Sequence, residues 1–79
     1  MTMSWQAKDV FRVFADRDMR PGDSLGPEVL FHAVGRSGAV VADGIKALED
    51  LGYVQVAQNQ TSIILTDDGY EAIRNGATV

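Results

Sequence analysis

The sequence predicts a small α+β domain in which three helices precede a two-stranded β-hairpin and a short final helix. Apolar residues recur at helical spacing through the first two thirds of the chain. Two short runs rich in β-branched residues then flank a polar Gln-Asn-Gln segment, which is typical of a hairpin. Capping residues and glycines separate the elements. The 79 residues are enough for a single domain with one core, spanning residues 1–79.

The first helix is expected to begin after Ser4, a favourable N-cap residue, and to end near Asp18. Its buried face is predicted by four apolar residues at helical spacing: Ala7, Val10, Phe11 and Phe14. The Pro21-Gly22 pair that follows is a strong turn signal. Trp5 is offset from the buried face. It either holds this helix against the core or belongs to a partner or dimer surface, where Trp is enriched.

A second, short helix is expected from Pro27, which loses no helical hydrogen bond at a first position, to Gly35. Its predicted core contacts are Leu30, Phe31 and Val34. Ser37 then caps a third helix that ends at Gly52, a natural residue for the left-handed position after a helix. Three of its residues, together with Phe14, are expected to be almost fully buried: Val41, Ile45 and Leu48.

Gly44 lies inside the third helix, where it costs about 1 kcal/mol relative to alanine. Close approach of a neighbouring helix would explain its presence. Residues 53–57 and 61–65 are predicted to form two strands joined by a polar tip. Thr66 is expected to cap the last helix, with Asp67 and Asp68 placed favourably in its first turn.

This order resembles the winged helix-turn-helix superfamily, in particular bacterial regulators of the MarR and PadR type. The resemblance covers roughly residues 25–73. Gly35 lies six residues before Val41, as the turn glycine does in that family. Residues 48–54, Leu-Glu-Asp-Leu-Gly-Tyr-Val, are similar to the family's exit from the recognition helix, and residues 65–69, Leu-Thr-Asp-Asp-Gly, are similar to its entry into the last helix. The implied fold is a small winged helix-turn-helix.

The resemblance implies a transcriptional regulator that binds double-stranded DNA. The third helix would enter the major groove, and the hairpin tip would touch the adjacent groove. Arg36 and Ser37 would contact phosphates, with help from Lys46. The candidate DNA-binding residues are Arg36, Ser37, Ala39, Val40, Asp43, Lys46, Gln58, Asn59, Gln60 and Thr61.

Other features favour a winged-helix module that binds protein and not DNA. The formal net charge is −4, whereas nucleic-acid binders usually present a basic surface. Asp43 would face the phosphates with like charge, and the alanines of the third helix can make only apolar contacts. The candidate partner interface comprises Trp5, Ala39, Val40 and Ala42. Its partner would be another protein or a second copy of the chain. DNA binding remains the preferred interpretation, since most small free-standing domains of this kind bind DNA.

Catalysis and cofactor binding are not expected. The chain has no cysteine, so thiol catalysis, disulfides and cysteine-zinc sites are excluded. The one histidine, His32, has no companion ligands at metal-binding spacing. No nucleophile, base or phosphate-binding loop is recognisable, and no metal or cofactor is predicted. The absence of a signal peptide or a long apolar run predicts a cytoplasmic protein that does not associate with a membrane.

Overall fold

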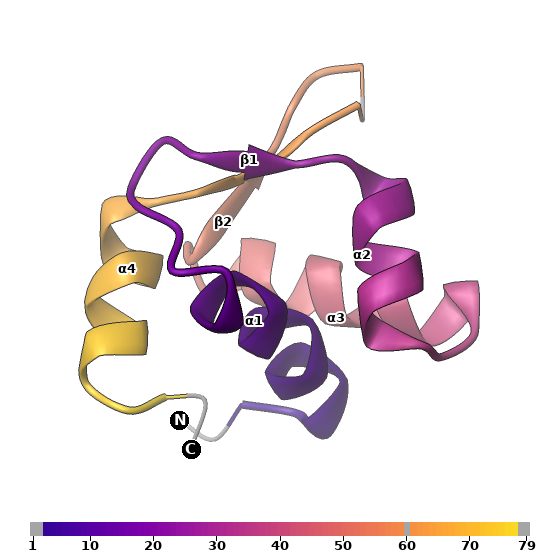
Figure 1. The fold of residues 1–79 in the computed structure, drawn as a ribbon, viewed down its shortest axis with the longest axis horizontal. Coiled ribbons are helices and arrows are strands. Elements are labelled where there is room, and N and C mark those ends of the chain that lie inside the picture. Colours follow the sequence, from indigo (N-terminus) through magenta and orange to yellow (C-terminus); the bar gives the residue numbers. More distant parts are fainter. Residues whose placement is uncertain (1–2, 60, 78–79) are drawn as a thin grey trace.

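The structure, a computed structural model, describes residues 3–59 and 61–77 (Figure 1). This part of the chain forms a small α+β unit with four helices and a three-stranded antiparallel sheet. The elements in chain order are α1 (Trp5–Asp16), β1 (Ser24–Leu25), α2 (Pro27–Val34), α3 (Gly38–Asp50), β2 (Val54–Val56), β3 (Ile63–Leu65) and α4 (Asp67–Arg74).

The sheet has the strand order β1-β3-β2, so its central strand is the last of the three in the sequence. The predicted pairing of β2 with β3 is confirmed, although both strands are shorter than expected. Ala57 N extends this ladder by donating to Ser62 O at 2.9 Å. The sequence prediction missed β1, which pairs Leu25 with Ile63. A strand of two residues is too short to show the alternation from which strands are recognised.

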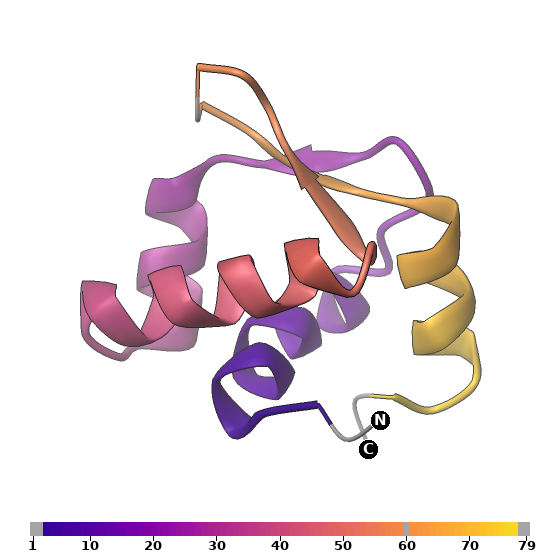
Figure 2. The same cartoon turned by 180° about the vertical axis from the view of Figure 1, so that it is seen from behind.

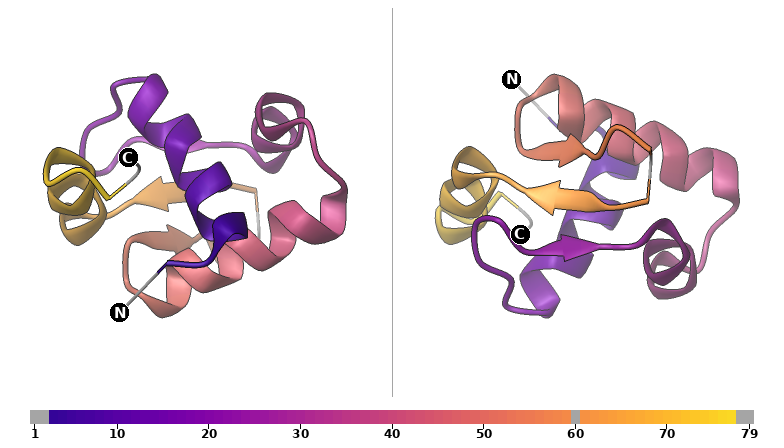
Figure 3. Two further views of the ribbon diagram at one scale, coloured as in Figure 1. Left: turned by 90° about the horizontal axis from the view of Figure 1, so that it is seen from below. Right: turned by 90° about the horizontal axis from the view of Figure 1, so that it is seen from above.

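The helices pack on one side of the sheet. Figure 2 shows α3 running beneath the hairpin. Figure 3 shows α1 crossing α3 under the sheet, with α2 and α4 near opposite ends of the sheet. The core lies between these layers. Its largest fully buried side chains are Phe11, Phe14, Leu30, Leu48, Leu65, Val10 and Val41. The predicted burial of Phe14, Val41 and Leu48 is thereby confirmed.

Two of the predictions for the core are wrong. Ile45 packs against the core but is only partly buried, and Phe31, predicted as a core contact, is 39% exposed. Both side chains lie at the edge of the core, beside an open space between α2, α3 and the hairpin. Helical spacing identifies the side of a helix that carries apolar residues, but it does not tell how far the neighbouring elements extend over that side.

The predicted caps are confirmed. The Ser4 hydroxyl accepts from Ala7 N at 3.2 Å, and the Ser37 hydroxyl accepts from Val40 N at 3.4 Å. Thr66 caps α4 by accepting from Gly69 N at 3.0 Å. Each bond satisfies one of the amides that a helix start leaves without a partner.

Thr66 also anchors α4 to the turn between α3 and β2. Its hydroxyl donates to Gly52 O at 2.6 Å, and its amide donates to Tyr53 O at 3.1 Å. Gly52 adopts φ 78°, the left-handed conformation expected after the end of α3. Hydrogen bonds to backbone carbonyl groups therefore hold together the end of α3, the start of β2 and the start of α4.

The predicted close approach at Gly44 is also confirmed. Gly44 is buried, and α1 passes directly over it. A Cβ atom at this position would lie 2.5 Å from the carbonyl oxygen of Gln6 and 2.6 Å from Cγ2 of Val10. Only glycine leaves room for α1 to pack this closely against α3.

We expect Gly44→Ala to destabilise the domain despite the better helix propensity of alanine. Overpacking of a core costs about 1–3 kcal/mol or more, and a backbone carbonyl cannot turn aside as a side chain can. The offsetting gain in helix propensity is about 1 kcal/mol. Urea-induced unfolding followed by circular dichroism measures the net loss in the free energy of unfolding.

Gly38→Ala is the matched control. A Cβ atom there would meet only Cε1 of Phe31, at an ordinary 3.9 Å. This variant should be as stable as the wild type or slightly more stable. If Gly44→Ala proved equally harmless, α1 and α3 would not meet as described.

Candidate functional site

The solvent-facing side of α3 carries mixed charges. Val41, Gly44 and Leu48 are buried, whereas Ala39, Asp43, Lys46 and Asp50 are exposed along the opposite side. Within α3 there are three carboxylates, including that of Glu49, and one ammonium group. The side of α3 that a DNA groove would receive therefore has a negative net charge.

Lys46, predicted to assist phosphate binding, is engaged by carboxylates of its own helix. Its Nζ lies 2.8 Å from Oδ1 of Asp50 and 4.0 Å from Oε1 of Glu49. The hydrogen bond with Asp50, together with the negative charge of that carboxylate, raises the pKa of Lys46 above its ordinary value. The ammonium group is thus charged and already has a nearby counter-ion.

Arg36, the other predicted phosphate contact, is directed towards α1. Its Nε donates to Oδ2 of Asp9 at 2.6 Å. Its guanidinium carbon lies 5.1 Å from the centre of the Trp5 ring, within the range of a cation–π contact. Trp5 is 52% exposed, so it does not hold α1 against the core. The surface alternative remains, with Trp5 and Arg36 forming one cluster beside the turn between α2 and α3.

The hairpin tip offers polar but uncharged groups. Oδ1 of Asn59 accepts from the Thr61 amide at 3.2 Å and from its hydroxyl at 2.6 Å. Gln58 is exposed, and Gln60 lies outside the described residues. Asn59 and Thr61 bond to each other and shape the turn, in the manner of an Asx-type motif.

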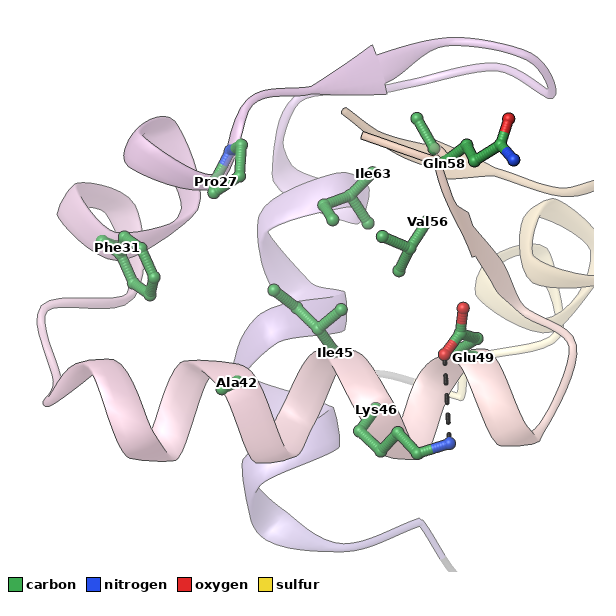
Figure 4. A pocket seen from close by; sticks show the side chains of 10 residues that line it. Pro27, Phe31, Ala42, Ile45, Lys46, Glu49, Val56, Gln58 and Ile63 are labelled. Carbon is green, nitrogen blue, oxygen red and sulfur yellow. Dashed lines mark ion pairs between the residues drawn. The ribbon is translucent and has the colours of Figure 1, made fainter. Parts of the chain in front are cut away.

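An apolar hollow of about 470 Å³ lies between α2, α3 and the hairpin (Figure 4). Its floor and walls are mostly apolar, and its charged lining residues, Lys46 and Glu49, come from α3. Of the predicted partner residues, Ala42 lines this hollow, whereas Trp5 lies in the separate cluster with Arg36. The lining residues are Pro27, Phe31, Ala42, Ile45, Lys46, Glu49, Val56, Ala57, Gln58 and Ile63.

Sequence reasoning placed Phe31 and Ile45 in the core and did not predict the hollow. One signal was available in α2. Its eight residues, Pro-Glu-Val-Leu-Phe-His-Ala-Val, carry more apolar side chains than a single buried face of a short helix can hold. Only Leu30 is fully buried, and Val29 is 37% exposed. The surplus indicated a second apolar surface on this helix.

Comparison with known proteins gave no match, whether to a family model, a curated protein or a solved structure. Among the described residues, no helix is long and apolar enough to cross a membrane. In the same part of the chain, no three His, Asp or Glu residues are grouped so that they could hold a metal ion.

The pairing of Lys46 can be tested by removing its partners one at a time. We expect Asp50→Asn to lower the pKa of Lys46 towards its ordinary value, because the closest negative charge disappears and the remaining amide oxygen is a weaker acceptor than a carboxylate. Glu49→Gln should lower it less, since that carboxylate lies farther away. NMR titration of the lysine side chain measures both shifts. Equal shifts in the two variants would contradict the assigned pairing.

Proposed function

We propose that this chain is a winged-helix domain whose α3 and hairpin face binds a protein partner in preference to duplex DNA. One observation carries the proposal: this face combines an apolar hollow with a helix of negative net charge. An apolar surface that the fold leaves uncovered is typical of a protein-binding site.

The arrangement of the elements supports the winged-helix assignment. Two helices, α2 and α3, are joined by a turn of three residues, Gly35–Ser37, as in a helix-turn-helix. A hairpin follows α3 directly and projects from the helices (Figure 1). In winged-helix domains this pairing of a helix with a hairpin forms the binding face, so the ligand of that face defines the function.

The charge distribution argues against DNA as that ligand. Binding to duplex DNA draws much of its affinity from cations that neutralise phosphates. Here four of the seven Lys and Arg residues lie between residues 8 and 20, on α1 and the turn after it. Close to α3, Arg36 and Lys46 both have carboxylate partners, and Asp43 adds an exposed negative charge.

Duplex DNA is the second candidate, because these ion pairs are accessible to solvent. The side chains of Arg36 and Lys46 are 52% and 68% exposed. Exposed ion pairs contribute only about 0–1 kcal/mol, so a phosphate could replace the carboxylate in each pair. In that case the affinity would be low, largely independent of sequence and strongly dependent on salt.

Charge reversal at Asp43 distinguishes the two candidates. We expect Asp43→Arg and the control Glu71→Arg, at an exposed residue of α4, to alter DNA affinity by the same small factor, because both add the same charge. If α3 entered a groove, Asp43→Arg alone would tighten binding, and more so at low salt, where screening is weakest. Fluorescence anisotropy with a labelled random-sequence duplex at two salt concentrations measures this difference.

Saturable binding of the wild-type protein to that duplex, strengthened by Asp43→Arg and unaffected by Glu71→Arg, would overturn the proposal in favour of DNA. Circular dichroism of the three proteins establishes that they are equally folded.

A further inference from the structure

We infer that the hollow between α2, α3 and the hairpin receives a short amphipathic segment of another protein, one that carries apolar side chains next to a lysine or arginine. This inference rests on the proposed function and specifies the chemistry of the partner. It follows from the openness of the hollow, from the character of its lining and from the charge at its rim.

The hollow is an open groove rather than an enclosed cavity. Phe31 is 39% exposed and Ala42 is exposed, although both line it. Small-molecule sites bury most of the surface of their ligand, which an open groove does not. A peptide segment that lays one face into a groove and leaves the other face in water fits this shape.

The lining requires an apolar face on that segment. Ile45 from α3 and Val56 and Ile63 from the hairpin point into the hollow in Figure 4, and Phe31 closes it on the side of α2. An accessible aromatic side chain beside a concave apolar surface is a favourable anchor for binding. Ile63 is already only 2% exposed, so the main attraction would come from burial of the three groups that are still accessible, Phe31, Ile45 and Val56.

The charged groups at the rim favour a positive charge beside that face, because the cation there, Lys46, is shared between two carboxylates, those of Glu49 and Asp50. Lys46 lies closer to Asp50, at 2.8 Å, than to Glu49, at 4.0 Å. The carboxylate of Glu49 therefore has only a distant counter-ion, although it lies at the edge of the hollow. With a net charge of −4 on the chain, a lysine or arginine of the segment would be attracted to this rim and would pair with Glu49.

Selection from a displayed library of random peptides, with the full chain as bait, tests this inference. We expect the enriched peptides to combine apolar residues with a net positive charge. With Glu49→Lys as bait, the charge preference should shift towards acidic peptides. With Glu71→Lys, which makes the same charge change on α4 outside the hollow, the preference should stay as in the wild type.

Two substitutions show whether the selected peptides bind in the hollow. Ala42→Gln places a larger side chain in it at an exposed position, and Ala33→Gln makes the same change on α2 outside it. We expect Ala42→Gln to lower the affinity for a synthesised copy of a selected peptide about tenfold, which corresponds to about 1.4 kcal/mol of binding free energy. Isothermal titration calorimetry measures this affinity. Ala33→Gln should leave the affinity unchanged. Thermal melts of both variants exclude a folding defect.

The outcomes separate the inference from the proposed function. Peptides that bind in the hollow without a charge preference, or a preference unchanged by Glu49→Lys, would overturn the inference and leave the proposed function in place. If the selection enriched no peptides relative to a support without the protein, both the inference and the proposed function would be overturned. A second copy of this chain is the other possible occupant of the hollow, and sedimentation velocity tests for it. If the chain associated as its concentration rose, and Ala42→Gln abolished that association, the hollow would bind a second copy. That result would overturn the assignment of a basic segment.

Discussion

The close contact of α1 with α3 at Gly44 is the constraint on which the rest of the structure depends. With no side chain at this position, the two helices approach until α3 lies against Gln6 and Val10. The contact fixes the rotation of α3 about its axis, so Val41 and Leu48 enter the core. By helical geometry, Ala42 and Glu49 then lie on the flank that faces the hairpin, and Asp43 faces solvent.

The second consequence of this contact concerns the hairpin. Because α3 is held in place at its centre, the turn at its end can position β2 and α4 through the bonds of Thr66 to Gly52 and Tyr53. The hairpin therefore begins beside the end of α3, and α2 closes the third side of the space between them. The three elements meet over Ile45 but do not cover it, which leaves the apolar hollow. In this account, the hollow results from the same packing that forms the core.

The sequence predicted the features that depend on neighbouring residues. Caps at Ser4, Ser37 and Thr66, the helix stop at Gly52 and the burial of Leu48 follow from local hydrogen bonding and helical period. Apart from the close approach at Gly44, which a glycine inside a helix indicated, it could not predict features that depend on distant segments. These include the pairing of β1 with β3, the bond between Arg36 and Asp9 across 27 positions, and the partial exposure of Phe31 and Ile45. Each depends on where the fold brings another element.

The central proposal is that the α3 and hairpin face binds a protein partner in preference to duplex DNA. Amide NMR spectra of the labelled protein, recorded while a random-sequence duplex is added at low salt, test it residue by residue. We expect no saturable shifts in residues 38–46 of α3 or 57–59 of the hairpin, because α3 has a negative net charge and these hairpin residues include no cation to attract phosphates. Saturable shifts confined to these two segments, and reversed by added salt, would contradict it.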